Sequence, residues 1–338
     1  MAKTEQRLIR LGIVGCGNIA RGHAGGYKKI RGARLCAFCD KEREHAEALR
    51  DEFAPNAKVV SDFDDMLESG VSAVSICTPN AFHYAQTMKA LKAGVHVLCE
   101  KPIAGTTAEA TRMIRAAEKE DRVLHVNQTM RYHGAYQQLH RLSRKDRLGE
   151  LLHIRCLRGM AVDPDELEAQ GRAWFHSREH HGGIVLDLGV HMADVLTWIG
   201  GPVNRVAAFT DSRRKGTNAT DHASALFRFE SGSTGVLELS WDMPVGGTIL
   251  EVYGAKGRVH MDIATKQIAH TRLTTRGERT RLYDLKPSRR NSFQAFIDAV
   301  RGVAPTDTPG ELGRYALALC KAIEESGATG RFVNVKTF

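Results

Sequence analysis

Three polar residues interrupt an otherwise apolar segment in the second half of the chain. The segment reads GGIVLDLGVHMADVLTWIGG, and within it Asp187, His191 and Asp194 are spaced four and three residues apart. On a helix this spacing places all three side chains on one face. A carboxylate within reach of an imidazole could orient it as a general base that titrates near neutral pH. The pair could instead satisfy a buried helix without any catalytic role.

A metal site is the other use that these residue types allow. Asp187, His191 and Asp194, helped by His180 or His181, are oxygen and nitrogen ligands that divalent ions accept. A Cys-x-x-Cys pair, Cys36 and Cys39, has no second pair or His pair at zinc-ligand spacing, and it lies inside a strand-like run. We predict no metal site, and we interpret the two cysteines as buried small hydrophobic residues.

A glycine-rich turn near the start of the chain is typical of dinucleotide binding. A strand-like run over residues 8–14 leads directly into GCGNIA at 15–20. In a dinucleotide fold the first glycine makes the tight turn, the second lets the backbone approach the pyrophosphate, and the small sixth residue lets the helix pack on the strand. The positive end of that helix attracts the phosphates. We therefore predict that four residues bind the cofactor: Gly15, Gly17, Asn18 and Ile19.

Asp40 ends the second strand-like run, 25 residues after the first glycine of the turn. An acid at this place is suited to hydrogen-bond the ribose diol of NAD, and it would repel the 2′-phosphate of NADP. Lys41 and Arg43 lie just beyond and could partly offset that repulsion. The sequence favours NAD, with NADP possible.

Polar residues also follow two later strand-like runs. Thr78, Asn80 and His83 follow the run that ends at residue 77, and Glu100 and Lys101 follow the run that ends at residue 99. In an open parallel sheet, ligands bind beyond the carboxyl ends of the strands. We therefore expect all five residues at the cofactor site.

The elements that must position these residues fall into two groups. Up to about residue 127, short β-branched runs alternate with helical stretches such as 81–93 and 107–120, which predicts a parallel sheet with helices on both faces. A helix over 135–147, a strand over 151–158 and a helix over 183–199 follow. Consecutive strand-like runs with short turns over 203–261 then predict an antiparallel sheet, and helices over 292–301 and 310–326 close the chain. We place a dinucleotide-binding domain at 1–127 and a second α/β domain at 128–338.

Composition excludes several classes of protein. The 338 residues are 42% hydrophobic and 26% charged, as in an average globular protein, so disorder and fibrous repeats are excluded. The net charge is +9, but the basic clusters lack interleaved aromatic residues, and we predict no nucleic-acid partner. Neither a signal peptide nor an uninterrupted apolar run of membrane-spanning length is evident. The seven cysteines fit a reducing compartment, and we expect a cytoplasmic protein that does not bind membranes.

Taken together, these motifs resemble those of the Gfo/Idh/MocA oxidoreductases, relatives of glucose–fructose oxidoreductase and inositol dehydrogenase. The resemblance rests on GCGNIA, TPNAFH, GVHVLCEKP and GGIVLDLGVHMADVL, in that order, and continues through DHASALFRFESGSTGVLELSW and LEVYGAKGRV to the closing helix. It covers about residues 7–335. The EKP and DxGxH segments are its specific parts, because glycine turns alone are common.

The resemblance implies an N-terminal Rossmann domain over 1–127 and a substrate-binding, oligomerising α/β domain over 128–338. The second domain would have a large, open, mostly antiparallel sheet whose outer face makes dimers or tetramers. It implies that Lys101, Asp187 and His191 are catalytic. Arg131 and Tyr132 match a recurrent substrate-side position, and Trp174 could line the sugar pocket, although a loop aromatic packed for stability is an equal alternative. Arg131 could bind an anionic substrate group or be an ordinary surface cation.

The function expected from the resemblance is hydride transfer between a nicotinamide cofactor and a hydroxyl or keto carbon of a sugar, cyclitol or related polyol. Two alternatives stay open. One is an enzyme that holds and recycles its NAD, such as an epimerase, an aldose–aldose oxidoreductase or a glycosidase-like enzyme. The other is a non-catalytic regulator that senses nucleotide or sugar with the same pocket. Cofactor exchange and turnover distinguish the three.

Overall fold

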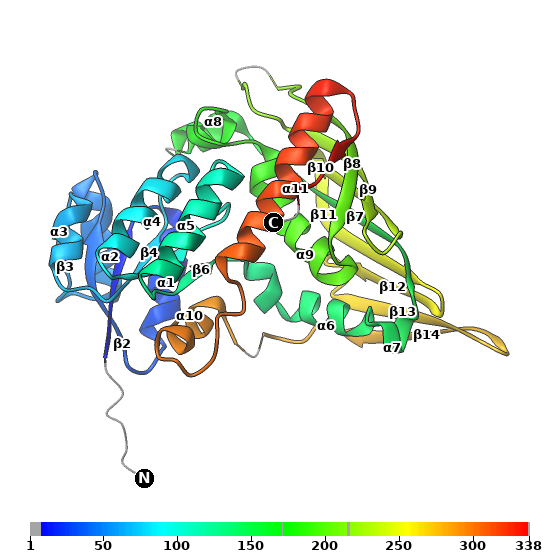
Figure 1. The fold of residues 1–338 in the computed structure, drawn as a ribbon, viewed down its shortest axis with the longest axis horizontal. Coiled ribbons are helices and arrows are strands. Elements are labelled where there is room, and N and C mark those ends of the chain that lie inside the picture. Colours follow the sequence, from blue (N-terminus) through cyan, green and yellow to red (C-terminus); the bar gives the residue numbers. More distant parts are fainter. Residues whose placement is uncertain (1–7, 171, 215–216, 289, 337–338) are drawn as a thin grey trace, which may run out of the picture. The chain divides into compact units, whose positions relative to one another are not determined.

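The computed structural model describes residues 8–170, 172–214, 217–288 and 290–336. They form two compact units, and Figure 1 labels most of their helices and strands. The first unit comprises the described residues up to 128 together with 290–314. The second comprises the described residues of 129–288 and those from 315 onward.

The first unit is built on a six-stranded, fully parallel sheet, which confirms the predicted Rossmann architecture. Its strand order is β3-β2-β1-β4-β5-β6. Neighbouring strands β1 and β4 are where the order reverses, and ligands bind beyond the strand ends at such a point. The strands are β1 (Ile9–Val14), β2 (Ala33–Cys39), β3 (Lys58–Val60), β4 (Ala73–Ile76), β5 (His96–Cys99) and β6 (Leu124–Val126).

Helices connect these strands, and each buries one face. In α1 (Asn18–Lys28) the buried residues recur at helical spacing and include His23, an ionisable group on an otherwise apolar face. The N-terminus of α5 (Thr107–Lys119) is fixed by a capping box between Thr106 and Glu109. The others are α2 (Arg43–Phe53), α3 (Phe63–Glu68), the short η1 (Asn80–Phe82), α4 (His83–Lys92) and α10 (Ser292–Val300).

A late segment, residues 290–314, packs into the first unit, although the predicted boundaries assign it to the second domain. The buried His125 of β6 has its ring nitrogens 2.9 Å from the Ser292 hydroxyl and 2.7 Å from the Thr306 hydroxyl. Phe293 of α10 packs against Tyr27 of α1, with ring centroids 5.1 Å apart. These are long-range contacts between distant parts of the chain, so no local sequence signal predicts them. The boundaries of the functional domains stay a prediction.

The second unit is built on a nine-stranded sheet in the order β14-β13-β12-β11-β7-β10-β9-β8-β15. Every neighbouring pair is antiparallel except β7 with β10, which confirms the mostly antiparallel sheet. The strands are β7 (Leu151–Ala161), β8 (Val203–Asp211), β9 (His222–Phe229), β10 (Thr234–Ser240), β11 (Asp242–Gly254), β12 (Gly257–Asp262), β13 (Gln267–Thr274), β14 (Gly277–Asp284) and β15 (Val333–Asn334).

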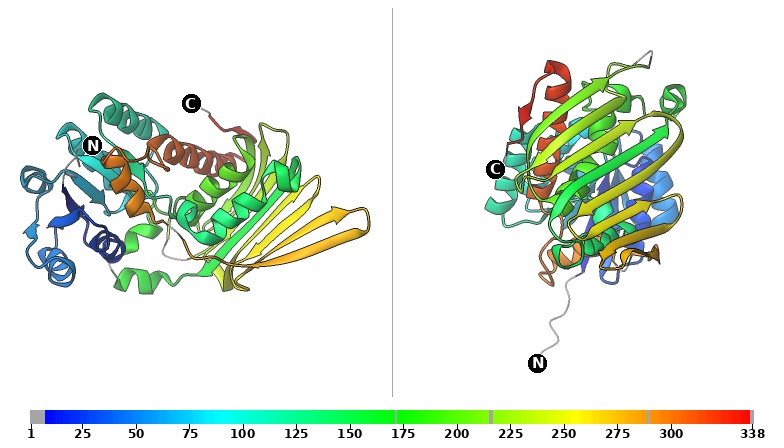
Figure 2. Two further views of the ribbon diagram at one scale, coloured as in Figure 1. Left: turned by 90° about the horizontal axis from the view of Figure 1, so that it is seen from below. Right: turned by 90° about the vertical axis from the view of Figure 1, so that its right-hand side faces the viewer.

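One face of this sheet carries the core of the unit. Buried side chains such as Ile154, Leu237 and Leu250 point to the side on which α9 (Val190–Gly200) packs. Figure 2, right, shows the opposite face in front, with no helix over it. The other helical elements in or entering the unit are η2 (Thr129–Tyr132), α6 (Gly134–Leu142), α7 (Lys145–Leu148), α8 (Pro164–Ala169), η3 (Ala173–His176), the π-helical turn η4 (Val185–Gly189) and α11 (Gly310–Thr329).

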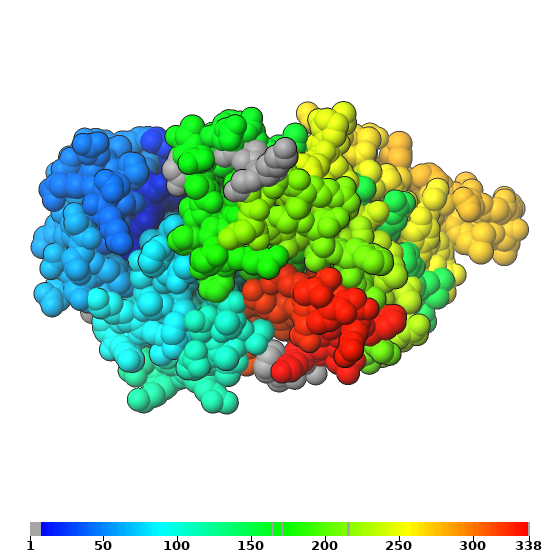
Figure 3. Space-filling model, turned by 90° about the horizontal axis from the view of Figure 1, so that it is seen from above, coloured from blue at the N-terminus to red at the C-terminus, as the bar shows by residue number. Residues whose placement is uncertain are grey.

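Several elements differ from the sequence pattern. The helix predicted over 135–147 is broken into α6 and α7. The polar stretch after β7 contains α8, whose N-cap Asp163 accepts the backbone N–H of Asp165. Strands β13 and β14 follow the last predicted strand and project as a hairpin, seen in orange at the end of unit 2 in Figure 3. Most side chains of β14 are exposed, so it lacks the apolar alternation that marks a half-buried strand.

Candidate active site

The glycine turn after β1 has the geometry that a dinucleotide requires. Gly15 has φ +80°, and a Cβ there would lie 2.6 Å from the backbone nitrogen of Thr78, so only glycine fits. At Gly17, by contrast, an added Cβ would meet no atom within 4 Å. Because Gly17 is also the N-cap of α1, open space adjoins the helix end whose first N–H groups lack acceptors within the helix. These residues therefore fit the pyrophosphate of a bound nicotinamide dinucleotide.

Asp40, at the end of β2, is tied to this turn. Its Oδ2 accepts the Cys16 backbone N–H at 2.6 Å, and its Oδ1 accepts that of Glu42 at 3.0 Å. Because a carboxylate oxygen can accept more than one hydrogen bond, Asp40 can hold the turn and bind a ribose diol at the same time. The two flanking cations already have contacts: Lys41 lies over the ring of Phe82 (5.7 Å) and Arg43 pairs with Glu47 (2.9 Å).

The neighbouring Cys-x-x-Cys pair is not poised for thiol chemistry. Cys36 and Cys39 belong to β2, and both are free thiols. Burial raises the pKa of the Cys36 thiol and raises the pKa of Cys39 to about 12. A reactive cysteine needs a lowered pKa, so these two thiols serve as packing residues.

Thr78, Asn80 and His83 lie beyond β4, as expected. The Thr78 hydroxyl donates to Gln86 at 2.6 Å, and Asn80 is buried. The ring nitrogens of His83 lie 2.9 Å from the Thr78 carbonyl and 2.7 Å from the Pro102 carbonyl. Burial lowers the pKa of this imidazole. His83 therefore links the loop after β4 to the loop after β5, and direct cofactor contact by these residues stays a prediction.

Glu100 and Lys101 follow β5, but Glu100 points into the protein. Its carboxylate contacts His23 of α1 and Asn127, and only 7% of the residue is exposed. Lys101 is half-buried at the turn itself. The sequence analysis predicted no role for His23 or Asn127. The signal that could have pointed to His23 is its place as an ionisable residue on the buried face of α1.

In the second unit, Asp187 and His191 lie on a helix that is irregular between them. Asp187 belongs to the π-helical turn η4, whereas His191 and Asp194 belong to α9. A π turn holds more residues than an α turn and is frequent at functional sites. The spacing argument, which assumes a regular α-helix, is therefore only approximate here. Asp187 is half-buried and His191 is 9% exposed.

Asp194 forms an ion pair with Arg131. Asp194 is 1% exposed, and the Nε–H of Arg131 donates to both its oxygens, Oδ2 at 2.8 Å and Oδ1 at 3.0 Å. Burial raises the pKa of Asp194 even against the hydrogen bond and charge of Arg131. The guanidinium also lies over the ring of Trp198 at 5.1 Å. Arg131, which the sequence analysis placed on the substrate side, thus pairs with the buried Asp194.

The remaining predicted substrate-side residues are aromatic. Tyr132 is buried, whereas Trp174 is half-exposed and stacks on Phe175 with ring centroids 3.9 Å apart. Within the described residues, no group of three or more His, Cys, Asp or Glu side chains is arranged to hold a metal ion.

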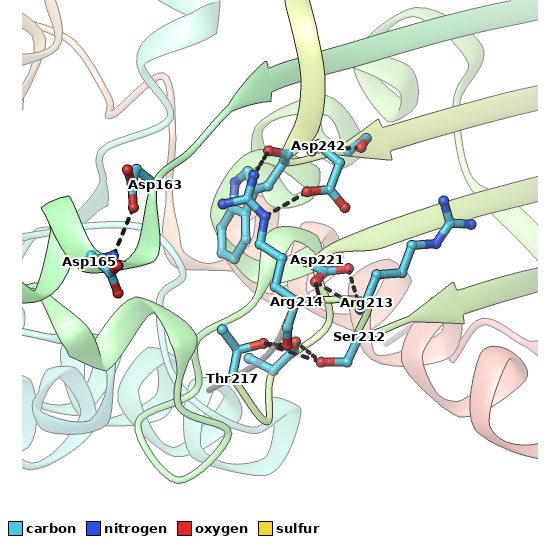
Figure 4. A network of polar contacts seen from close by, with 11 residues as sticks. Asp163, Asp165, Ser212, Arg213, Arg214, Thr217, Asp221 and Asp242 are labelled. Carbon is cyan, nitrogen blue, oxygen red and sulfur yellow. Dashed lines mark hydrogen bonds and ion pairs between the residues drawn. The ribbon is translucent and has the colours of Figure 1, made fainter.

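A network of polar contacts holds residues 212–214 against Asp221 and the start of β11 (Figure 4). Asp221 is fully buried and accepts the backbone N–H groups of Arg213 and Arg214, at 2.9 and 2.8 Å. The Arg214 guanidinium donates to Asp242 and to the Trp241 carbonyl, each at 2.6 Å. The guanidinium of Arg214 therefore has a structural role in this segment.

Comparisons with known proteins agree with this geometry. The model of an oxidoreductase family with an NAD-binding Rossmann fold matches residues 9–128, and the model of the GFO/IDH/MocA C-terminal domain matches residues 136–260. The chain belongs to the Gfo/Idh/MocA oxidoreductase family. It is therefore a nicotinamide-dependent dehydrogenase or reductase.

The family match extends over nearly the full length of its relatives. The chain is 28% identical to 1,5-anhydro-D-fructose reductase from Ensifer adhaerens, covering 97% of this chain and 99% of the relative. It is also 28% identical to myo-inositol 2-dehydrogenase from Thermotoga maritima, with the same coverage. The WlbA dehydrogenase from Bordetella pertussis, solved with NADH and UDP-GlcNAcA, superposes with a TM-score of 0.86 at 25% identity, covering 98% of this chain and 100% of that one.

Proposed function

We propose that this Gfo/Idh/MocA protein transfers hydride between NAD and a hydroxyl or keto carbon of a sugar, cyclitol or related polyol. The observation that carries the proposal is the full-length match to sugar and cyclitol oxidoreductases, in a chain that retains Lys101, Asp187 and His191. All three residue types suit alcohol oxidation. We also propose a cytoplasmic location, which the thiols of Cys36 and Cys39 support. Among the described residues, no helix has both the length and the apolarity to cross a membrane.

Each catalytic side chain has a distinct role in this proposal. When bound, the nicotinamide accepts the hydride. His191 takes the proton from the substrate hydroxyl, because imidazole is a base near neutral pH. Asp187 hydrogen-bonds the imidazole or the hydroxyl. Lys101 stabilises the alkoxide charge that develops on the oxygen.

A spectrophotometric screen tests the proposal. Purified protein is mixed with NAD or NADP and with sugars, inositols and sugar acids, and reduced cofactor is measured. We expect NADH to form in proportion to the substrate oxidised. Product without net NADH, from a protein that purifies with NAD bound, would indicate an enzyme that recycles its cofactor. Binding without any turnover across the panel would indicate a sensor.

Cofactor choice gives a first mutational prediction. We expect NAD to bind more tightly than NADP, and Asp40→Ala to narrow the preference, because the carboxylate that repels a 2′-phosphate is lost. NAD affinity itself should also fall, since Asp40 holds the Cys16 N–H of the phosphate turn. Fluorescence titration with both cofactors measures this, with the exposed Asp51→Ala as control. Equal affinity of the wild type for both cofactors would show that Lys41 and Arg43 override the carboxylate.

Assembly gives the next prediction. We propose a homodimer or homotetramer formed through the uncovered face of the nine-stranded sheet (Figure 2). On that face the register aligns Leu226 with Val236, and Phe209 and Leu226 are 84% and 59% exposed. Arg155 pairs with Glu238 and Glu251 among these apolar side chains. A second copy of the same face would cover such a surface, because a symmetric dimer interface is self-complementary.

Light scattering at micromolar concentration should give the molar mass of a dimer or tetramer. Leu226→Asp should lower that mass toward the monomer, because the interface would then bury a charge. Val303→Asp, an equally polar change at an exposed site of the first unit, should leave the mass unchanged. A monomeric wild type would contradict the proposed assembly.

A further inference from the structure

Glu100 is the centre of a buried polar network beneath the turn that carries Lys101. One carboxylate oxygen, Oε1, lies 2.8 Å from Nε2 of His23 and 2.5 Å from Nδ2 of Asn127. The other oxygen, Oε2, accepts the backbone N–H of Lys101 at 3.1 Å. The three donors come from α1, from the residue after β6 and from the turn itself. One side chain thus joins three elements of the first unit.

The network holds a charged carboxylate. Burial by itself raises the pKa of Glu100, but the hydrogen bonds from His23 and Asn127 and the charges of His23 and Lys101 outweigh it and leave the pKa below its ordinary value. A carboxylate can only accept hydrogen bonds. His23 Nε2 and Asn127 Nδ2 therefore donate to it, and hydrogen bonds to a buried charge are stronger than those between neutral groups.

The two supporting side chains are themselves fixed. His23 is 1% exposed, and its ring packs edge-on against Phe293 with centroids 4.8 Å apart. Asn127 is 2% exposed, and its backbone N–H donates to the Cys99 carbonyl at 2.9 Å, which ties it to the end of β5. Because neither donor can easily move, the position of the Glu100 carboxylate is set by the core of the unit.

The backbone is held on both sides of Lys101. Oε2 of Glu100 fixes the N–H of Lys101, and the ring of His83 contacts the carbonyl of the following Pro102 at 2.7 Å. A small displacement of a catalytic group can lower a rate by about 10²-fold. A buried carboxylate at this point is therefore placed to control where the Lys101 side chain begins.

We propose that Glu100, supported by His23 and Asn127, is a positioning residue for Lys101 and acts through the Lys101 backbone. This replaces the sequence expectation that Glu100 binds the cofactor directly. It rests on the proposed function in so far as that function assigns Lys101 to the reacting oxygen.

The test compares Glu100→Gln with Glu118→Gln, the same change at an exposed site of the same unit. A glutamine has one acceptor oxygen. Because both His23 and Asn127 donate to Oε1 of Glu100, the glutamine oxygen takes that place, and its NH2 group leaves the Lys101 N–H without an acceptor. We expect hydrogen–deuterium exchange at the Lys101 amide to accelerate about tenfold or more, as for a lost hydrogen bond. This readout needs no substrate, so it stands even if the screen finds no activity.

The kinetic readout separates positioning from a general loss of structure. With a substrate from the screen, we expect Glu100→Gln to lower kcat about 10- to 10²-fold, with little change in NAD affinity. In a Lys101→Ala background the same substitution should have almost no further effect on kcat, because residues that act as one unit are not additive. Penalties that multiply in the double variant, or an unchanged Lys101 amide, would overturn the proposal. If Glu100→Gln does not fold, Asn127→Ala, which removes one hydrogen-bond donor to Glu100, is tested by the same two measurements.

Discussion

Replacing His191 by alanine is expected to lower turnover by about 10²–10⁴-fold, the usual loss when a general base is removed. NAD affinity should be nearly unchanged, because the phosphate turn and Asp40 lie in the first unit and keep all their contacts. The measurement is steady-state NADH formation together with a fluorescence titration of NAD. Lys101→Ala should likewise give a slow enzyme that still binds the cofactor.

The control for this experiment is another histidine of the same unit. His180 is exposed and contacts the hydroxyl of Ser177 at 2.8 Å, so His180→Ala removes an imidazole without touching α9. We expect this variant to keep wild-type turnover. If His191→Ala also keeps wild-type turnover, His191 is not the base.

Removing the guanidinium of Arg131 is expected to lower the free energy of unfolding by about 3–5 kcal/mol, because it leaves the buried charge of Asp194 without its partner. The side chain of Arg131 is 13% exposed and that of Asp194 is 1% exposed. Urea unfolding of Arg131→Ala at neutral pH measures the loss. Arg141→Ala, at an exposed position of α6, should change stability little.

The loss at Arg131 should depend on pH in a defined direction. Burial already raises the pKa of Asp194, and without Arg131 it should rise further. A folded-state pKa above the unfolded value means that the folded protein binds the proton more tightly, so stability rises as pH falls through that range. The destabilisation should therefore shrink at acidic pH, and adding Asp194→Asn should relieve part of it at neutral pH. A loss that is small at neutral pH would show that the ion pair is dispensable.

Local patterns were enough to predict the parallel sheet of the first unit. The alternation of strands and helices predicted the parallel sheet, and the spacing from Gly15 to Asp40 predicted that both would lie at the cofactor end of β1 and β2. Those features depend on residues close in sequence. The packing of 290–314 against His125 could not be predicted, because its contacts join residues more than 160 positions apart.

In the second unit, sequence spacing predicted the contacts of the site residues less well. Spacing placed Asp187, His191 and Asp194 on one face, but the π turn at Val185–Gly189 changes that spacing and Asp194 pairs with Arg131. Arg131 was expected on the substrate side because the resemblance matched it to a recurrent position there. Its pairing with Asp194 could not be predicted, because the two residues are 63 positions apart. The contacts of Glu100 could not be predicted for the same reason: its partners, His23 and Asn127, come from distant elements.

Isotope transfer tests hydride transfer most directly. A substrate that the screen identifies is deuterated at its hydroxyl-bearing carbons and oxidised by the wild-type protein with NAD, and the released NADH is analysed by mass spectrometry. We expect NADH heavier by one deuterium, in equal amount to the oxidised product. Unlabelled NADH, or product without released NADH, would contradict direct hydride transfer to an exchangeable nicotinamide cofactor.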